Sequence, residues 1–378
     1  MKHALVLFLC ALASLPLAAA GKTVKIGAIF AVTGPASFLG APEQKTAQML
    51  VDEINAKGGV NGDKLALIIK DSEGSPEKAV SFAKQLIDEE KVFAIIGPTT
   101  SGESLAIKKI CEEGKTILIS CAAADAIVNP LASWVFKTPQ KDSDVVKWIY
   151  DTMKKKGLTK IGVLSANTGF GKSGKAQLEA LATNAGITIL ISEVFDKQAT
   201  DLTSVLTKIK AMNVQAIVNW SIEPAQSIIP KNMKQINMNV PLFQSHGFGN
   251  VKYATEAGKA GEGIVFPCGR IFVADQLADK DPQKAVLQKY KKDYETKFKE
   301  DVSTFGGHAY DAILILTEGM KKAGSADKAK VRAAIENIKG LAGTAGVFNY
   351  SATDHSGLGM DSLSLLTVKD GKFVLYKE

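Results

Sequence analysis

The chain has 378 residues with 46 basic and 39 acidic side chains, a net charge of +7 and four cysteines. This length gives room for two domains of ordinary size, and so few cysteines exclude a disulfide-built scaffold. Charges of both signs alternate in runs such as KYKKDYETKFKE, which predicts a solvated surface and not a nucleic-acid groove.

The first twenty residues are typical of a cleavable secretory signal. Lys2 and His3 form a polar start, an apolar run extends over 4–15, and three alanines at 18–20 make a small-residue cleavage site. The apolar run is too short to span a bilayer. We therefore expect a protein exported to the periplasm that begins near Gly21. Three cysteines remain in that mature chain, and the sequence leaves their pairing open: Cys111, Cys121 and Cys268.

Strands and helices alternate regularly after the signal. In a first block we expect strands at 24–30, at 65–69 and near Val92, with helices at 44–56, at 76–89 and from Ser101. In a second block, after Pro139, we expect helices at 144–155, 172–183, 202–212 and 225–235, and strands at 160–165, 187–194, 216–220 and 242–245. Near-continuous apolar strands in this order predict parallel sheets covered on both faces, with ligands bound at the carboxyl ends of the strands.

The last hundred residues have a different pattern. Helices at 283–298, 307–322 and 328–339 follow one another, and strands come only near Phe348 and at 362–375. Helices without strands of their own must lie on a sheet that is already built. We therefore expect the chain to cross between two lobes near Pro139, Pro267 and Ser351.

An internal repeat supports two lobes of like construction. The segment 25–34, KIGAIFAVTG, returns 135 residues later as KIGVLSANTG at 160–169. Both copies are a strand followed by an Ala-x-Thr-Gly turn. Matched strands with matched turns predict two similar lobes, with a cleft between them that both turns face.

A candidate anion site lies within 92–120, where an apolar strand ends in Thr99, Thr100 and Ser101 and a helix begins. The first turn of a helix has free backbone N–H groups and a partial positive charge, so it suits a small carboxylate. The alternative is that Ser101 only caps its helix.

A second motif offers a rival function. Gly169–Gly174 fits G-x-G-x-x-G after a strand, with Glu193 at the distance expected for a ribose contact, which would suit an exported dinucleotide-binding enzyme. The phosphate-loop pattern fails because Ala166 replaces its first glycine. Since dinucleotides are scarce outside the cytoplasm, we prefer a flexible turn beside the cleft. We find no metal-ligand spacing and no catalytic constellation, which favours a receptor that closes on a ligand.

The sequence resembles the periplasmic Leu/Ile/Val-binding protein family, the type I solute receptors of branched-chain amino-acid ABC importers. The likeness covers essentially the whole mature chain. The segments that carry it are KIGAIFAVTGP, VDEINAKGGVNGDKL (51–65), AIIGPTTS (94–101), ILISCAAADA (117–126) and FGGHAYDA (305–312). The resemblance implies an α/β fold of two Rossmann-like lobes with parallel sheets and three hinge crossovers, ligand capture by lobe closure, and docking of the closed form on a membrane permease.

The resemblance also assigns roles to individual residues. Ser101 matches the family serine that binds the ligand carboxylate, which favours the anion site over the cap. Ala122 matches a backbone carbonyl that contacts the ligand ammonium. Phe305 matches an aromatic wall, and Phe170 stands where the family often has a tyrosine.

Several departures concern the ligand amine. The acid that neutralises the ammonium in typical members falls at His246, a neighbouring threonine falls at Ala124, and a tyrosine falls near Ile222. Glu223 is close enough in sequence to replace the acid. The disulfide of some members, which would join Gly74 to Thr100, is absent.

We predict a monomeric periplasmic binding protein of an ABC importer, with no enzymatic activity and no cofactor. The family favours a branched-chain amino acid. The residues favour an acid without an α-amino group, such as an aromatic or branched-chain oxo acid, because an ammonium buried against His246 would lack a carboxylate. We assign 21–139 with 268–350 to an N-terminal lobe and 140–267 with 351–378 to a C-terminal lobe. The predicted ligand-binding positions are Leu39, Thr99, Thr100, Ser101, Ala122, Ala124, Phe170, Ile222, Glu223, His246 and Phe305.

Overall fold

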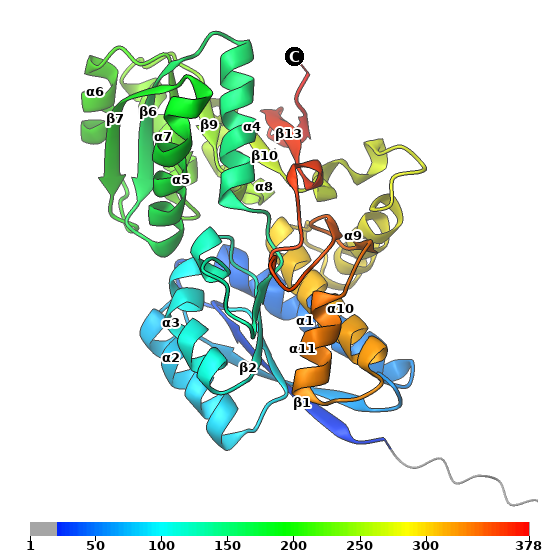
Figure 1. Cartoon of the computed structure of the whole chain (residues 1–378). Coiled ribbons are helices and arrows are strands. Elements are labelled where there is room, and N and C mark those ends of the chain that lie inside the picture. The colour runs from blue at the N-terminus through cyan, green and yellow to red at the C-terminus, as the bar shows by residue number, and fades with distance from the viewer. Residues whose placement is uncertain (1–20, 378) are drawn as a thin grey trace, which may run out of the picture.

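A computed structural model of the chain describes residues 21–377 and shows two α/β lobes, one above the other (Figure 1). The expected signal segment, 1–20, lies outside the described residues. Within 21–377, no helix is both long and apolar enough to cross a membrane.

The first lobe is built on a parallel sheet with strand order β2-β1-β3-β4-β5. Its strands are β1 (Thr23–Phe30), β2 (Lys64–Asp71), β3 (Ala94–Ile96), β4 (Ile117–Ser120) and β5 (Val135–Lys137). One face packs against α1 (Ser37–Ala56), α10 (Thr304–Ala323) and α11 (Lys328–Glu336), and the other against α2 (Pro76–Lys84) and α3 (Ser101–Glu113). The late helices α10 and α11 thus lie on the sheet already built, as expected.

The second lobe has a larger sheet of order β14-β13-β10-β9-β8-β6-β7. The parallel strands are β6 (Lys160–Ala166), β7 (Thr188–Phe195), β8 (Ala216–Trp220), β9 (Leu242–Gln244) and β10 (Val265–Cys268), and β13 (Ser364–Lys369) and β14 (Lys372–Leu375) form an antiparallel edge. One face packs against α4 (Asp142–Lys155) and α5 (Gly169–Ala185), and the other against α6 (Thr203–Ala211), α7 (Ala225–Gln235) and α8 (Val251–Ala257).

The two sheets repeat one topology. In the first, β1 lies between β2 and β3; in the second, β6 lies between β7 and β8. The order β2-β1-β3-β4-β5 therefore corresponds strand by strand to β7-β6-β8-β9-β10. The sequence repeat at 25–34 and 160–169 falls on the equivalent strands β1 and β6, which confirms two lobes of like construction.

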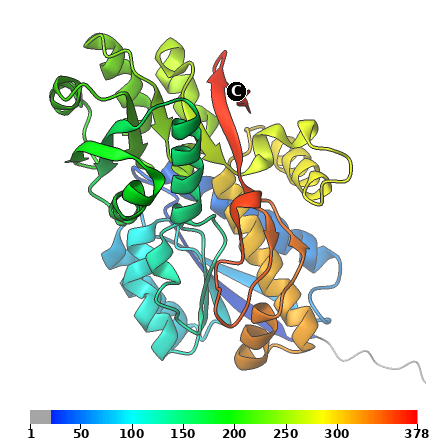
Figure 2. The same cartoon turned by 45° about the horizontal axis from the view of Figure 1, so that its top comes forward.

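The chain passes from the first sheet to the second after β5, returns after β10, and crosses again after a short hairpin of β11 (Leu341–Ala342) and β12 (Val347–Phe348). Between the second and third crossings, α9 (Lys284–Phe298) packs Leu287 and Tyr290 against Met49 of α1 and Ile271. This helix therefore does not lie on a sheet, contrary to the expectation for 283–298. In Figure 2 this yellow segment projects from the side of the molecule, near the red C-terminal hairpin. The exact lobe boundaries that we assign stay a prediction.

Several elements differ from the expected ones. Helix α1 begins at Ser37 and not near residue 44, because Leu39 and Gly40 are buried beside the loop after β1. The helix expected at 76–89 is α2 followed by a π-helical turn, Gln85–Glu89. The single strand expected at 362–375 is a hairpin, since Asp370 and Gly371 both adopt positive φ and reverse the chain.

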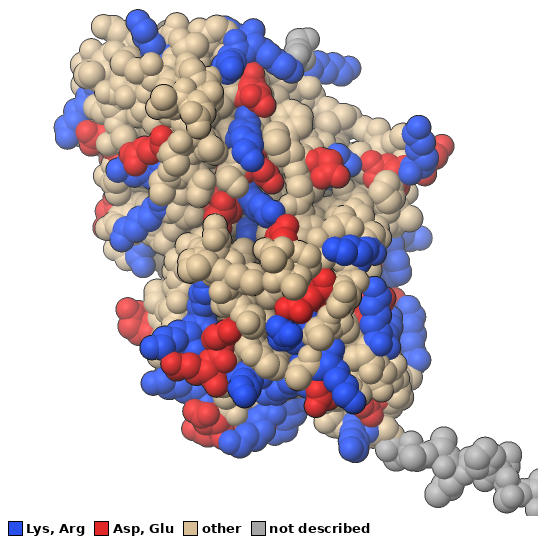
Figure 3. Space-filling model, viewed as in Figure 1, with Lys and Arg blue, Asp and Glu red and all other residues tan. Residues whose placement is uncertain are grey.

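Within residues 21–377 the three cysteines are buried and free, which answers the pairing question that the sequence left open. On the face displayed in Figure 3, lysines and arginines lie interspersed with acidic side chains, as the mixed charge runs indicate.

Candidate ligand site between the lobes

A cavity that is partly open to solvent lies between the lobes at the carboxyl ends of both sheets. The structure brings together most of the predicted site residues in its lining: Leu39, Thr99, Ser101, Ala122, Phe170, Ile222, His246 and Phe305. It adds residues that the sequence did not single out: Cys121, Ala123, Pro139, Gly247 and His308. Thr100, Ala124 and Glu223 lie outside this lining.

The start of α3 gives Thr100 and Ser101 different roles. Thr100 is the N-cap residue: its hydroxyl accepts from Glu103 N, and its own N–H donates to the Glu103 carboxylate at 2.9 Å. The capping interpretation of Ser101 is therefore wrong. Ser101 Oγ accepts from Ala124 N at 3.2 Å, so its hydroxyl proton stays available to the cavity, and Ala124 acts through its backbone.

Thr99 lines the cavity but its hydroxyl is already engaged. It accepts from Ala31 N at 2.9 Å and donates to the Glu43 carboxyl. Burial raises the pKa of Glu43 well above its usual range. Thr99 therefore joins the loops after β1 and β3 beneath the cavity, and Ser101 is the hydroxyl of this turn that remains free to bind a ligand.

Three helix N-termini converge on the cavity. Ser101, Phe170 and Phe305 line it from the first turns of α3, α5 and α10. Side chains cap all three helices, through Thr100, Thr168 and Ser303. Helix N-termini carry partial positive charge, and the cavity lining contains no aspartate or glutamate. The electrostatics therefore favour an anionic ligand.

Two buried histidines, His246 and His308, lie in the lining. His246 packs edge-on against Phe170 with ring centroids 5.4 Å apart, and neither of its ring nitrogens has a hydrogen-bond partner. Burial lowers the pKa of His246 well below its usual range and lowers that of His308 to about 3. Both imidazoles are therefore neutral at pH 7.

Two buried ionisable residues lie behind this lining. Lys137, at the end of β5, donates to the carbonyls of Ala123 at 2.6 Å, Pro139 at 3.2 Å and Gln140 at 3.0 Å. Asp142 accepts from Ser173 Oγ at 2.6 Å, and its Oδ1 lies 3.8 Å from His246 Nε2. Lys137 thus fastens the loop that carries Ala122 and Ala123 to the first crossover.

Glu223 does not face the cavity. Its carboxylate accepts from Ile222 N at 2.8 Å and from the Thr168 side chain, and burial raises its pKa. Ile222 itself lines the cavity. The acid that could replace the missing family carboxylate is thus turned toward its own backbone and the cap of α5.

The glycine turn at 169–174 is packed against protein. A Cβ on Gly169 would lie 2.7 Å from Gly102 N in the opposite lobe, and one on Gly174 would lie 2.2 Å from the Trp220 ring. These glycines allow close approach of lobe to lobe and of helix to sheet. The space that a pyrophosphate would need is filled, so the dinucleotide alternative is not favoured.

The lobes also touch at other points around the cavity. Asn250 Nδ2 donates to Phe38 O at 3.0 Å, and Thr304 N donates to Gly249 O at 3.1 Å. Together with the contact between Gly102 and Gly169, these bonds describe a closed arrangement.

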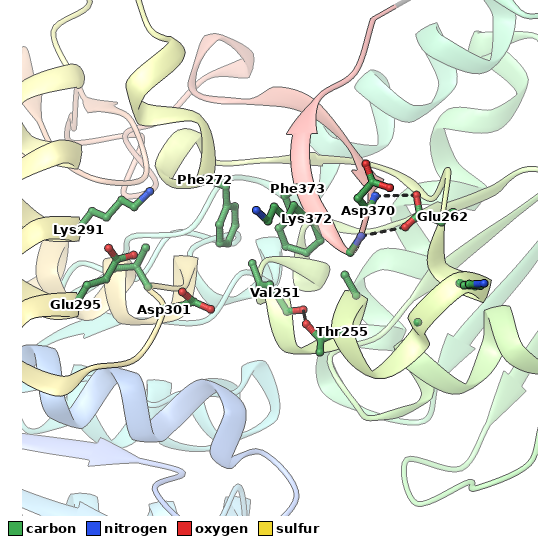
Figure 4. Close-up of a pocket in the computed structure, with 15 residues that line it drawn as sticks. Val251, Thr255, Glu262, Phe272, Lys291, Glu295, Asp301, Asp370, Lys372 and Phe373 are labelled. Carbon is green, nitrogen blue, oxygen red and sulfur yellow. Dashed lines mark hydrogen bonds between the residues drawn. The ribbon is translucent and has the colours of Figure 1, made fainter.

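A larger groove lies away from this cavity, between α8, α9 and the C-terminal hairpin (Figure 4). Val251, Phe272 and Phe373 give it an apolar floor, and its rim carries charges of both signs. Glu262 in that rim accepts from the N–H groups of Asp370 and Gly371, which fixes the hairpin turn. In the cavity, His246 and His308 carry buried side-chain atoms that have no hydrogen-bond partner. Among the described residues that line the groove, no side chain carries such an atom.

Comparison with known proteins agrees with this architecture. The sequence profile described as "Periplasmic binding protein" matches residues 23–372. The Leu/Ile/Val-binding protein BraC3 of Rhizobium johnstonii is 27% identical over 370 residues, 96% of each chain. The leucine-, isoleucine-, valine-, threonine- and alanine-binding protein of Pseudomonas aeruginosa is 27% identical over 322 residues, 84% of this chain and 83% of that protein.

Solved structures show the same fold. An extracellular ligand-binding receptor from Rhodopseudomonas palustris HaA2 superposes with a TM-score of 0.88 at 26% identity, covering 93% of this chain and 99% of the receptor. The branched-chain amino acid transporter substrate-binding protein LivJ of Streptococcus pneumoniae, solved with isoleucine, gives 0.81 at 25% identity, covering 93% of this chain and 98% of that one. The chain therefore belongs to the periplasmic binding protein family, and it is similar to Leu/Ile/Val-binding proteins within that family.

Proposed function

We propose that this protein is the periplasmic substrate-binding protein of an ABC importer, and that it closes its lobes on a small carboxylate with an apolar body and no α-amino group. Membership of the family supports the transport role and the absence of enzymatic activity. The names of the relatives, which include leucine, isoleucine and valine, support a ligand body of branched-chain size.

One observation carries the proposal about the amine: the cavity lining has no acidic side chain, and a neutral histidine stands where the family acid is expected. A buried ammonium without a carboxylate would lose its hydration with little compensation. The carboxylate of the same ligand, by contrast, can accept a hydrogen bond from the Ser101 hydroxyl and is stabilised by the partial positive charge at the N-terminus of α3.

Asp142, the acid beside His246, does not change this balance. Asp142 is fully buried behind His246, accepts from Ser173, and lies in the field of the Lys137 ammonium. Burial raises the pKa of Asp142 to about 8, which weakens it further as a partner for a cation.

Calorimetry on the mature protein tests the proposal with two compounds that share one body, L-leucine and 4-methyl-2-oxopentanoate. We expect the oxo acid to bind at least ten-fold more tightly. Tighter binding of leucine would overturn the amine-free ligand and leave the transport role standing. Binding of NAD in the same instrument would revive the dinucleotide alternative.

The remaining parts of the proposal follow the family. The closed form docks on permease subunits in the inner membrane, the protein acts as a monomer in the periplasm, and no cofactor takes part. Co-purification of a permease with the ligand-loaded protein, in preference to the ligand-free protein, would test the docking directly.

A further inference from the structure

The cavity holds buried polar atoms that have nothing to bind. Nδ1 of His246 and Nδ1 of His308 lack hydrogen-bond partners, although the two residues are only 6% and 5% exposed. His246 Nε2 also makes no hydrogen bond, but it lies 3.8 Å from Asp142 Oδ1 behind the lining. A buried polar group without a partner is costly, so a native cavity that keeps two such rings is expected to hold something that satisfies them.

The two rings come from opposite lobes. His246 begins the short 3₁₀ turn after β9 in the second lobe, and His308 lies on α10, one turn after Phe305, in the first. Both line the same cavity. A group held by both rings would therefore bind only when the lobes are closed.

The chemistry of the pair selects the group. A neutral imidazole has one nitrogen that donates and one that accepts, and neither ring here bears a charge that would attract an ion. Both rings can hold an ammonium only if both present acceptor nitrogens, and they can hold a keto oxygen only if both present donors. A hydroxyl can accept from one ring and donate to the other, or accept from both, so it suits more of the tautomer combinations of the pair.

We propose that His246 and His308 form a hydroxyl-binding subsite, and that the natural ligand is a hydroxylated carboxylate. This inference rests on the proposed function, since it assumes that the cavity takes an amine-free acid at Ser101. It goes further in naming a second polar group on the ligand and the two residues that recognise it.

Matched probes test the inference by calorimetry on the mature protein. One pair is 4-methylpentanoate and 2-hydroxy-4-methylpentanoate, in which the hydroxyl is beside the carboxylate. The other is phenylpyruvate and 4-hydroxyphenylpyruvate, in which it is at the far end. We expect the hydroxylated member of at least one pair to bind ten-fold or more tightly than its partner.

Variants of the two histidines then test whether their rings cause the preference for the hydroxylated probe. His246→Leu and His308→Leu should each abolish most of the preference while retaining affinity for the hydroxyl-free probe. His246→Gln, which keeps one donor and one acceptor, should retain it and shows whether loss in His246→Leu reflects misfolding. No preference in either pair, or a preference that survives both leucine variants, would overturn the subsite and indicate that ordered water fills it. Tighter binding of L-leucine than of every acid probe would instead overturn the proposed function.

Discussion

The contact between Gly102 and Gly169 allows lobe closure to be tested with a single methyl group. A Cβ on Gly169 would lie 2.8 Å from Gly102 Cα and 2.7 Å from Gly102 N, and both of those atoms belong to the backbone of the opposite lobe. Gly169→Ala must therefore hold the lobes apart by about 0.6 Å at this point to restore an ordinary contact. The second lobe itself should be unharmed, because alanine is favoured over glycine in a helix.

The expected cost can be estimated from similar overpacking elsewhere. Forcing a methyl group into a packed contact costs about 1–3 kcal/mol. Because the open form does not make this contact, the whole cost falls on the closed, ligand-bound state, and the dissociation constant should rise about 5- to 150-fold. Calorimetry with 4-methyl-2-oxopentanoate measures the affinity, and small-angle scattering with and without the same compound measures the closure.

Gly102→Ala is a matched control at the same interface. A Cβ there would meet Pro76 Cγ at 3.7 Å and Gly169 N at 3.9 Å, which are ordinary contacts. We expect this variant to bind and close as the wild type does. If Gly169→Ala retains full affinity and the same decrease in radius of gyration on binding, the lobes do not close to the contact seen here, and the reasoning is refuted.

Other predictions concern the cavity residues. Ser101→Ala should weaken binding of the carboxylate roughly ten- to a hundred-fold, since a hydrogen bond to a charged group is worth about 1.5–3 kcal/mol, with little change in melting temperature. Thr100→Ala should instead cost about 1 kcal/mol of stability by removing the cap; equal affinity losses in both variants would contradict these separate roles. His246→Glu should weaken binding of the amine-free acid and improve that of leucine, and an unaltered ratio of the two affinities would count against the ligand argument. Burial lowers the pKa of His308 to about 3, whereas the unfolded chain has a value of about 6.5 at this residue. Between these values the unfolded chain binds a proton that the folded protein does not. The free energy of unfolding should therefore fall as pH falls below about 6.5, by up to about 1.4 kcal/mol per pH unit. Urea unfolding at pH 7 and pH 5 should therefore show a smaller difference for His308→Gln than for the wild type, and equal differences would show that burial does not lower the pKa of His308.

The architecture could be predicted from the sequence because its signals are local and repeated. Apolar strands alternate with amphipathic helices, and the Ala-x-Thr-Gly turn recurs after β1 and β6. The turn before α3, with its three hydroxyl residues at 99–101, can also be recognised in the sequence. The spacing of Thr100 and Glu103 also fits a capping box, T-x-x-E, a signal that distinguishes the cap at Thr100 from the free hydroxyl of Ser101 and that our sequence-based prediction did not use.

The missed residues carry weaker signals. Strand β5 has only three residues, and it ends in Lys137, a residue type that is almost never fully buried unless its charge is satisfied. Its burial depends on three carbonyls brought together by the fold. His308 could have been found, since it lies three residues after Phe305 on the same helix and so shares its face. Glu223 is adjacent to Ile222 in sequence, yet its side chain turns away from the cavity, which no pattern of residue types predicts.

The most direct test of the account is to identify the ligand that the protein carries. Mature protein purified from its native host without added ligand, then denatured, would release its bound small molecule for mass spectrometry. The account predicts a carboxylic acid with an apolar body and no amine, and a hydroxyl on that acid would match the paired histidines. Release of leucine, isoleucine or valine in stoichiometric amount would contradict the central claim.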